Sequence, residues 1–581
     1  MKKTIVQRES LCQLGAWAKN LHPVMQRIYA NRNITSSTLL ENTLNHLLPF
    51  TELKDISKAV LLLAESLQNK ESIIIVGDFD ADGATSTALA IKALRLMGAT
   101  NITYTVPNRF KFGYGLTPGI IEEIKHQKPN LIITVDNGIS SIEGVVCAKR
   151  AGIKVIITDH HLAGKNLPEA DAIVNPNQPG DDFPAKSTAG VGIIFYLMLA
   201  LRAHLRESHW FENNNLAYPN LAQLLDLVAL GTVADVVPLE HNNRILVEQG
   251  LRRIRSGMAC PGIRALIKIG KRNEASLGAN DLGFTLGPRL NAAGRLEDMS
   301  IGIECLLSNS ETEANAIAIR LEQINAERKA IELKMQQQAL KELQALLNMD
   351  ATKIPLGICV YEKNWHQGVV GILAARLKEK YFRPVIAFAL ADEDEIKGSA
   401  RSIPGFHIRD ALDAIASQHP LILNKFGGHA MAAGLSINKN HFELFRSLFD
   451  DQVRKHISPE QLSYCLASDG ELTSKELSID IAKMLKEAGP WGQNFPEPLF
   501  NGRFHINSFR ILKDRHLKLQ LSTIDKRENM DAIAFNFLDD ETEHVDIQCG
   551  QTVSLAYKLD INEFRGQKTL QLLIEDLSIV Y

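Results

Sequence analysis

Short apolar runs alternate with segments of helical periodicity between residues 71 and 176. The apolar runs are rich in Ile, Val and Leu, and they predict strands at 72–76, 102–106, 131–135, 155–158 and 172–174. Between them the pattern predicts helices at 84–97, 117–126 and 141–150. Strands that are apolar throughout and alternate with helices indicate a parallel sheet covered on both faces. The predicted fold class of this region is therefore α/β, with a doubly wound parallel sheet.

A long run without glycine or proline lies between Gly302 and Pro355. Within it, Ser310 and Glu313 have the spacing of a capping box, and apolar residues then recur at helical spacing. We predict a long helix that connects two domains. A coiled-coil dimer is the alternative, and it is less favoured because Arg328 interrupts the apolar seam.

The pattern changes twice after the predicted long helix. A second α/β pattern comes first, with strands at 356–361, 384–390 and 396–401 and a helix at 369–380. From about Ser468, short alternating runs predict a small all-β barrel or sandwich, with strands at 504–511, 516–521, 532–537, 553–559 and 569–577. The expected domains are 1–300 with a sheet core at 71–240, a connecting helix at 301–350, a smaller α/β domain at 351–466 and an all-β domain at 467–581.

Composition limits the class of protein more than it limits the function. The chain has 581 residues, 45% of them apolar and 23% charged, with a formal net charge of −3, so any surface for nucleic acid must be local. The seven cysteines are odd in number and form no CxxC pair, which favours reduced thiols over a disulfide framework or a zinc site. The first residues do not resemble a signal peptide, and no apolar run approaches the length of a membrane span. We expect a soluble, cytoplasmic protein that does not contact the membrane.

Acidic and histidine residues gather directly after three predicted strands. DFDADG stands at 78–83, DNG at 136–138 and DHH at 159–161, and a further acid, Asp235, follows GTVA at 231–234. The carboxyl ends of parallel strands meet at one edge of a sheet, where ligands bind. An Asp after a strand is also a common helix N-cap, and that role is equally plausible for Asp136 alone. For the whole set at three strand ends, coincidence is a poor explanation.

So many carboxylates cannot lie together without a counter-charge, and few Lys or Arg residues occur in these motifs. Divalent cations are the simplest remedy. Carboxylates with one or two imidazoles suit Mn²⁺ or Mg²⁺, and histidine favours Mn²⁺. Two such ions, roughly 3.5–4 Å apart and bridged by one carboxylate, would activate water for in-line attack on phosphorus.

These motifs resemble the DHH phosphoesterase superfamily and, within it, the RecJ family of single-strand-specific 5′→3′ exonucleases. The similarity is carried by DFDADG (78–83), VDNG (135–138), DHH (159–161) and GTVADVVPL (231–239). It continues through GPRLNAAGR (287–295), WHQGVVGILAARL (365–377), KGSARS (397–402) and GGHAMAAG (427–434), which resemble the RecJ pattern and its DHHA1 domain. GPWGQNFPEPLF (489–500) resembles the lead-in to an OB-like domain. The resemblance covers nearly the whole chain.

The resemblance implies a role for each residue of the metal-binding pattern. Asp80 and Asp136 would hold one cation, with Asp78 close by. The other cation would be held by Asp82, Asp136, His160 and Asp235, with Asp136 as the bridge. His161 would face the scissile phosphate. For Asp159, the residue pattern itself leaves a helix N-cap or a hydrogen bond to a metal ligand as plausible as direct ligation of a metal. The residue pattern alone finds this cluster but does not divide it between two metals.

Candidate phosphate contacts lie outside the acidic cluster. They are Arg109, Arg289, Arg295, Ser399, Arg401, Gly427, Gly428 and His429. Arg109 follows a predicted strand and could clamp phosphate; a surface arginine is individually the more common case, but the resemblance favours the phosphate role. Ser399 and Arg401 alternate at strand spacing, and in RecJ-like enzymes such a pair holds the 5′ phosphate. A GGH sequence opening an Ala-rich helix at 427–429 could bind phosphate at the helix N-terminus, and a plain turn is the alternative.

The all-β tail mixes basic and aromatic residues, which is typical of a surface that binds single strands or, alternatively, of a charged barrel edge: Arg503, Phe504, Phe509, Arg510, Lys513, Arg515 and Lys518.

From the acidic cluster and the resemblance, we predict a single-stranded-DNA exonuclease that uses two divalent cations. The resemblance also implies a monomer that works in recombination and repair with a helicase and the single-strand-binding protein. The competing hypotheses are a hydrolase of dinucleotides or pyrophosphate, which would not need the tail, and a non-catalytic DNA-binding scaffold, which would have lost metal ligands.

Overall fold

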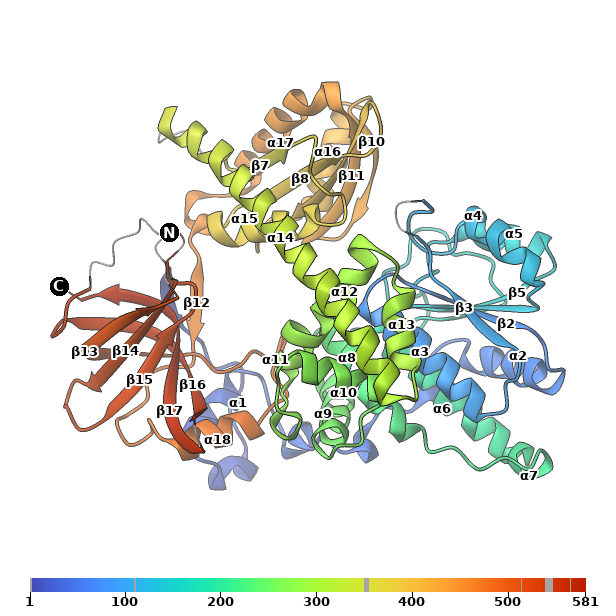
Figure 1. The fold of residues 1–581 in the computed structure, drawn as a ribbon, viewed down its shortest axis with the longest axis horizontal. Helices are drawn as coiled ribbons and strands as arrows, with labels where there is room; N and C mark the ends of the chain where they lie inside the picture. The colour runs from blue at the N-terminus through green and yellow to red at the C-terminus, as the bar shows by residue number, and fades with distance from the viewer. Residues whose placement is uncertain are drawn as a thin grey trace. The chain divides into compact units, whose positions relative to one another are not determined.

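The computed structural model describes residues 3–108, 111–349, 355–513, 515–538, 547–564 and 566–580 (Figure 1). The chain forms two compact units. Unit 1 consists of the residues up to Arg8, Ala326–Leu477 and Leu499–Tyr581. Unit 2 consists of Glu9–Asn325 and Ser478–Pro498. The chain therefore passes from one unit to the other four times.

Unit 2 is built around a parallel sheet of five strands in the order β3-β2-β4-β5-β6. The strands are β3 (Ile102–Thr105), β2 (Ile73–Gly77), β4 (Leu131–Val135), β5 (Lys154–Thr158) and β6 (Ala172–Val174). Helices α4 (Pro118–Ile124) and α5 (Ile142–Arg150) cover one face, and α2 (Ile56–Gln68), α3 (Ala81–Leu96) and α6 (Gly190–Glu207) cover the other (Figure 1). The doubly wound α/β fold predicted from the sequence is confirmed.

The central strands are apolar because both of their faces are covered. All five residues of β2 and of β4 are buried. Ile74, Ile132 and Ile157 pack with Ile120 of α4 and Val145 of α5 in one core cluster. Burying each such side chain contributes about 1.5–3 kcal/mol, so the sheet is a stable support for the residues at its edge.

A helical layer follows the sheet in sequence and completes unit 2. Its helices are α8 (Leu225–Ala234), α9 (His241–Arg255), α10 (Pro261–Ile269), the π-helix η8 (Leu282–Leu286), α12 (Gly287–Leu296) and α13 (Ser300–Leu307). The long helix predicted after the capping-box spacing of Ser310 and Glu313 is present, and residues 301–307 belong to a separate helix. The long helix is α14 (Glu311–Met349), and it is separated from α13 by Ser308–Ser310. The Ser308 hydroxyl donates to Glu313 at 2.8 Å, and the Ser310 side chain accepts from the Glu313 N–H at 3.4 Å, so the serines cap a new helix.

The α/β part of unit 1 has a five-stranded sheet in the order β10-β11-β9-β8-β7. Its strands are β7 (Ile358–Tyr361), β8 (Val385–Leu390), β9 (Glu395–Arg401), β10 (Leu423–Gly428) and β11 (Ala432–Asn438). Helix α15 (Val370–Tyr381) packs on β8 and β9, and α16 (Ile408–Gln418) and α17 (Phe442–His456) fill the apolar core of the other face. The prediction that GGH opens a helix was wrong, because these residues end β10 and turn into β11 as an antiparallel hairpin.

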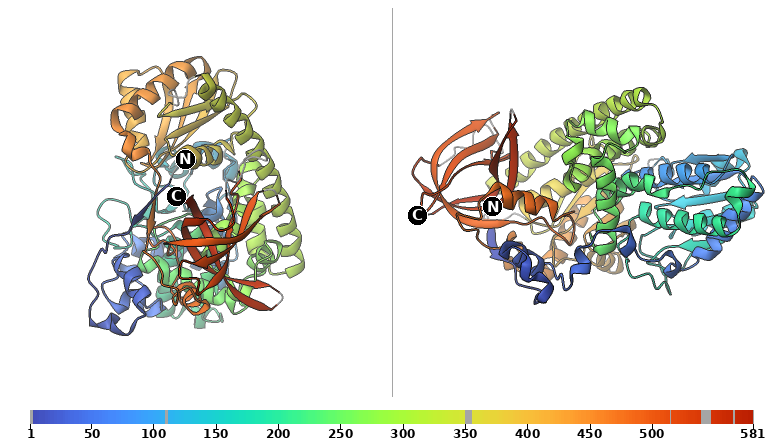
Figure 2. Two further views of the ribbon diagram at one scale, coloured as in Figure 1. Left: turned by 90° about the vertical axis from the view of Figure 1, so that its left-hand side faces the viewer. Right: turned by 90° about the horizontal axis from the view of Figure 1, so that it is seen from below.

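The C-terminal part of unit 1 is a closed barrel of five strands in the order β13-β14-β15-β17-β16 (Figure 2). The strands are β13 (Phe500–Leu512), β14 (His516–Thr523), β15 (Asn529–Ala534), β16 (Thr552–Phe564) and β17 (Gln567–Ile579). Phe500, Phe504 and Tyr557 are buried inside it. The predicted all-β domain is confirmed, but Phe504 is a core residue and offers no face to a nucleobase. Beside the barrel, β1 (Thr4–Gln7) pairs in parallel with β12 (Cys465–Ser468).

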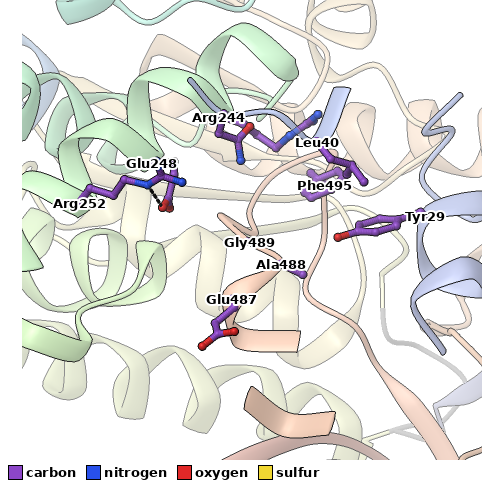
Figure 3. A pocket seen from close by; sticks show the side chains of 10 residues that line it. Tyr29, Leu40, Arg244, Glu248, Arg252, Glu487, Ala488, Gly489 and Phe495 are labelled. Carbon is purple, nitrogen blue, oxygen red and sulfur yellow. Dashed lines mark hydrogen bonds and ion pairs between the residues drawn. The ribbon is translucent and has the colours of Figure 1, made fainter. Parts of the chain in front are cut away.

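The segment Ser478–Pro498 leaves the barrel sequence and packs within unit 2. It contains α18 (Ile479–Glu487) and two stacked rings, Trp491 and Phe495, with centroids 4.9 Å apart. Arg32 lies over Trp491 at 5.2 Å and Arg244 over Phe495 at 4.2 Å, so a cation closes each end of the stack. A polar pocket of about 150 Å³ opens beside Phe495, Arg244 and Tyr29 (Figure 3). None of the strand-end acids lines it.

Candidate functional site

The acidic residues predicted from the sequence come together at the carboxyl edge of the parallel sheet. Asp78 follows β2, Asp136 follows β4, and Asp159 follows β5. Their strands are neighbours in the sheet, with Val76 opposite Thr134 and Val135 opposite Thr158. Asp235 reaches the same place from the C-terminal end of α8.

Asp136 holds an unusual backbone conformation at this edge. Its φ is +61°, in the left-handed region that non-glycine residues seldom adopt. Its side chain lies so close to Gly190 that a Cβ built there would be 2.6 Å from the Asp136 Cβ. A glycine is therefore required at the start of α6. Backbone strain of this kind is concentrated at functional sites.

Two helix N-termini hold acids of the DFDADG motif. Asp80 caps α3, and its Oδ1 accepts from the N–H groups of Asp82 at 2.9 Å and Gly83 at 3.0 Å. Asp82 accepts from the first N–H groups of α6, those of Gly190 at 2.7 Å and Val191 at 2.9 Å. These amides and the helix dipoles stabilise negative charge at the sheet edge.

His160 directs one ring nitrogen at the middle of the acids. Its Nε2 is 3.1 Å from Asp136 Oδ1, 3.5 Å from Asp235 Oδ2 and 4.0 Å from Asp82 Oδ2. Asp136 Oδ1 is buried and accepts no hydrogen bond among the described residues. One nitrogen among three carboxylate oxygens is an arrangement suited to a metal ion.

Asp159 is occupied by hydrogen bonds and forms part of no candidate metal group among the described residues. Its Oδ1 accepts from the backbone N–H of His160 at 2.7 Å and from His161 Nδ1 at 2.7 Å, and its Oδ2 accepts from the Ile139 N–H at 2.9 Å. Burial alone would raise the pKa of Asp159, but the bond from His161 lowers it below its usual value. Asp159 thus orients His161 from behind.

In the cluster, His161 has a raised pKa. Burial would lower the pKa of its imidazole, but the hydrogen bond with Asp159 and the charges of nearby acids such as Asp235 raise it to about 9. The hydroxyl of Tyr114 lies 3.3 Å from His161 Nδ1 and donates to the Asp136 carbonyl at 3.2 Å. Tyr114 was not among the predicted site residues. Its position after a predicted strand, close to Arg109, was the only sequence signal for it.

The remaining acids repel one another. Burial, followed by the charge of Asp80, raises the pKa of Asp82 to about 7. Burial and the charge of Asp82 raise the pKa values of Asp136 and Asp235 well above the usual range. Burial and mutual repulsion make the charged carboxylates unfavourable, and bound cations would stabilise them by supplying positive charge.

The donor set fits divalent metal ions of the Mn²⁺ or Mg²⁺ type. Three groups have ligand atoms within 4.8 Å of one another: Asp78, Asp80 and Asp136; Asp82, His160 and Asp235; and Asp136, His160 and His161. Oxygen ligands predominate, with imidazole in two of the groups. Asp136 and His160 each belong to two groups, so neighbouring ions could share them.

The predicted arginines near α12 have structural surroundings of different kinds. Arg289 is 8% exposed, pairs with Glu322 at 2.6 Å and donates to the Thr285 carbonyl. Arg295 is half-buried at the end of α12. Arg109 lies outside the described residues. Arg289, one of the predicted phosphate contacts, is therefore engaged by a carboxylate.

The small residues of α12 allow this helix to approach the DFDADG loop. A Cβ on Gly294 would collide with the carbonyl oxygen of Phe79. The Asn291 side chain also accepts from the Ala81 N–H at 2.8 Å. The NAAG sequence therefore supports the loop that carries Asp78 and Asp80 by close backbone packing and one hydrogen bond.

In unit 1, Ser399 and Arg401 lie together on one face of β9. The Arg401 guanidinium donates to the Ser399 hydroxyl at 3.2 Å and to the Ala400 carbonyl at 2.8 Å. No carboxylate pairs with it among the described residues, and burial lowers its pKa. Both side chains point at the first turn of α15, where a Cβ on Gly371 would meet Ser399 Oγ at 3.0 Å and Arg401 Nη2 at 3.1 Å. A buried cation beside a helix N-terminus is suited to an anion.

The glycines of the GGH hairpin extend the same face. Gly427 stands opposite Gly434, which stands opposite Ser399. A Cβ on either glycine would meet nothing within 4 Å, so the sheet surface next to Ser399 is open backbone. His429 lies in the turn after Gly428, and its backbone N–H donates to the Ala432 carbonyl at 2.8 Å.

Three parts of the chain match known families. Residues 72–232 match the DHH family N-terminal domain, 354–455 the DHHA1 domain and 468–576 the RecJ OB domain. The chain is 51% identical over 563 residues to the single-stranded-DNA-specific exonuclease RecJ of Salmonella typhimurium, covering 96% of each chain.

Solved structures agree with the sequence matches. The fold is similar to that of RecJ from Thermus thermophilus in complex with Mn²⁺, with a TM-score of 0.78, 28% identity, and coverage of 99% of this chain and 79% of that one. The Mg²⁺ complex of the Thermus thermophilus protein gives a TM-score of 0.73 at 27% identity, covering 99% and 78%. In the described part of this chain, no helix has both the length and the apolar character that a membrane crossing requires.

Proposed function

The chain belongs to the RecJ family of exonucleases, and from this premise we propose that it removes nucleotides from the 5′ end of single-stranded DNA. The observation that carries the proposal is the cluster of acids and histidines at the sheet edge, whose ligand atoms form overlapping metal-binding groups. The 51% identity to a single-stranded-DNA-specific exonuclease supports the substrate.

We propose that two divalent cations, Mn²⁺ or Mg²⁺, bind this cluster. Asp78, Asp80 and Asp136 would hold one, and Asp82, His160 and Asp235 the other. Asp136 would serve both, because its Oδ1 lies 3.1 Å from His160 Nε2. When bound, two such ions supply an activated water nucleophile and neutralise the charge on the leaving oxygen.

His161, oriented by Asp159, would bind an oxygen of the scissile phosphate. Asp159 accepts from His161 Nδ1 at 2.7 Å, which fixes the ring and leaves Nε2 to carry a second proton. Burial would lower the pKa of this imidazole, but the hydrogen bond with Asp159 raises it and so favours the charged ring. His161 can then donate a charge-assisted hydrogen bond to a phosphate oxygen, a role that needs no covalent intermediate.

The 5′ polarity would be set in unit 1. A terminal phosphate carries more charge than an internal one, and the Arg401 guanidinium with the first turn of α15 offers a matching site. Ser399 adds a hydroxyl, and the open backbone at Gly427 and Gly434 lets a strand approach closely. A strand whose 5′ phosphate is bound in this way would be degraded from that end. Arg109 and Arg295 stay candidates for further phosphate contacts.

The cellular setting follows from the family. We propose that the protein acts as a monomer in the cytoplasm, in DNA recombination and repair, on strands exposed by a helicase and in the presence of the single-strand-binding protein. The barrel would add affinity for single strands through its basic residues, such as Arg510 opposite Lys518.

The test uses 3′-labelled single-stranded DNA with either a 5′ phosphate or a bulky 5′ block. Both substrates are incubated with Mn²⁺ or Mg²⁺, with the wild type and with Asp136→Ala. Shortening from the open 5′ end, lost with the block and with Asp136→Ala, is the expected result. Digestion that ignores the block would exclude 5′ polarity, and cleavage confined to dinucleotides would redirect the assignment to a small-substrate hydrolase.

A further inference from the structure

An exposed aromatic ring stands on an irregular helix that packs against α8, the helix whose C-cap residue is Asp235. Phe284 is 82% exposed, among the most exposed of the large apolar side chains in the described residues. It belongs to η8, a π-helical turn between two α-helices. π-Helical turns are rare and are frequent at functional sites. An aromatic ring exposed on such a turn is accessible to a bound ligand.

A second exposed apolar residue follows the metal-ligand candidate Asp235. Val236 is 65% exposed and has a φ of +62°. This conformation is a clear outlier for a β-branched residue. The Val236 N–H donates to the Val233 carbonyl at 3.2 Å, so the left-handed residue ends α8 and leaves its apolar side chain in solvent.

The two features lie on elements that pack against each other. A Cβ on Gly283, the neighbour of Phe284, would be 3.2 Å from Val233 Cγ1, and one on Gly287 would be 3.1 Å from the Ala234 Cβ. Val233 and Ala234 directly precede Asp235. The element that carries Phe284 is thus packed on the helix end that delivers a candidate ligand to the metal cluster.

We propose that Phe284 and Val236 form a contact surface for a nucleobase of the bound strand, next to the scissile phosphate. This rests on the proposed function. A strand whose phosphate lies at the acids must place its bases beside them, and every base offers a flat face to an aromatic ring. The contact is indifferent to sequence, as an exonuclease requires. It fixes the strand and so sets which phosphodiester reaches the acids.

The test is a scan of single-stranded substrates that each lack one base at a defined distance from the 5′ end. The wild type should slow at one or two positions, where the missing base would have met Phe284. In Phe284→Ala, kcat/KM on intact strands should fall about tenfold, mainly through KM, the size of one base–aromatic stack. The dependence on the missing base should disappear.

Matched variants separate stacking from general damage. Phe284→Trp keeps a ring and should stay within about twofold of the wild type, whereas Phe284→Leu should resemble Phe284→Ala. Leu61→Ala removes another exposed apolar side chain, on α2, and should change nothing. An unchanged abasic profile in an active Phe284→Ala protein would overturn the proposal. A wild type without activity on any single strand would instead overturn the proposed function.

Discussion

Divalent cations should stabilise the folded protein, and more strongly at pH 8 than at pH 6. The reason is the raised pKa of Asp82, about 7 against an ordinary 3.8. A folded-state pKa above the unfolded value means that the folded protein holds the proton more tightly, so stability falls as pH rises from about 4 to about 7. Three pKa units correspond to about 4 kcal/mol as an order of magnitude.

The other resolved shifts around Asp82 do not reverse this trend. His161, with a pKa raised to about 9 from 6.5, stabilises the folded state fully below the unfolded value, and that contribution is lost as pH rises through the folded one. The lowered pKa of Asp159 acts only below its ordinary value of 3.8, outside the range tested. The metal-free protein should therefore become steadily less stable between about pH 5 and about pH 9.

Bound cations replace the proton as counter-charge. At about one hundred times its dissociation constant, an ion adds about 2.7 kcal/mol, which for a unit of roughly 340 residues raises Tm by about 4 °C. The assay is a thermal melt followed by circular dichroism, with a chelator or with Mn²⁺, at pH 6 and pH 8. Asp136→Asn is the control, since it removes one charge and one ligand and should melt higher than the wild type in chelator. A Mn²⁺ shift of equal size at both pH values, or in Asp136→Asn, would refute the reasoning.

Three further predictions concern single side chains. His161→Gln should lower kcat about 10²-fold or more with little effect on the Mn²⁺-induced rise in Tm, as measured by steady-state kinetics and thermal melting. If the Mn²⁺-induced rise in Tm is lost as well, His161 acts mainly as a metal ligand. Arg401→Ala should raise KM for 5′-phosphorylated strands about tenfold and leave 5′-hydroxyl strands nearly unchanged, as measured on matched oligonucleotides; Arg401→Lys should recover only part of the loss, and equal effects on both substrates would remove Arg401 from the 5′ site. Val236→Gly should raise Tm, since relieving a left-handed valine contributes about 1 kcal/mol, while KM for single strands rises; a lower Tm would mean that the valine is not strained.

The residues at the edge of the sheet could be predicted from the sequence because each one directly follows the strand that positions it. Continuous apolar runs define parallel strands, and whatever follows them must meet at one edge, so Asp78, Asp136 and Asp159 converge as expected. The backbone strain at Asp136 could not be predicted. It depends on Gly190, which is distant in sequence and close in space.

Three other features could not be predicted because they depend on residues that are distant in the sequence. The Ala-rich stretch after Gly428 favours a helix by propensity, yet seven residues of β11 pair with β9, and sheet pairing overrides propensity. Arg289 looks available in the sequence but is paired with Glu322 on α14. Phe504 has basic neighbours, and only the closure of the barrel places it inside.

The stacked rings of Trp491 and Phe495, with Arg32 and Arg244 over them, determine how the protein can be divided into fragments. The RecJ OB match begins at residue 468, but Ser478–Pro498 completes the other unit. Cutting the gene at that family boundary would strip two rings from a pair of buried arginines and leave an incomplete nuclease core. The boundaries of the family domains and of the compact structural units differ here. A fragment of unit 2 that is meant to fold alone must include residues 478–498.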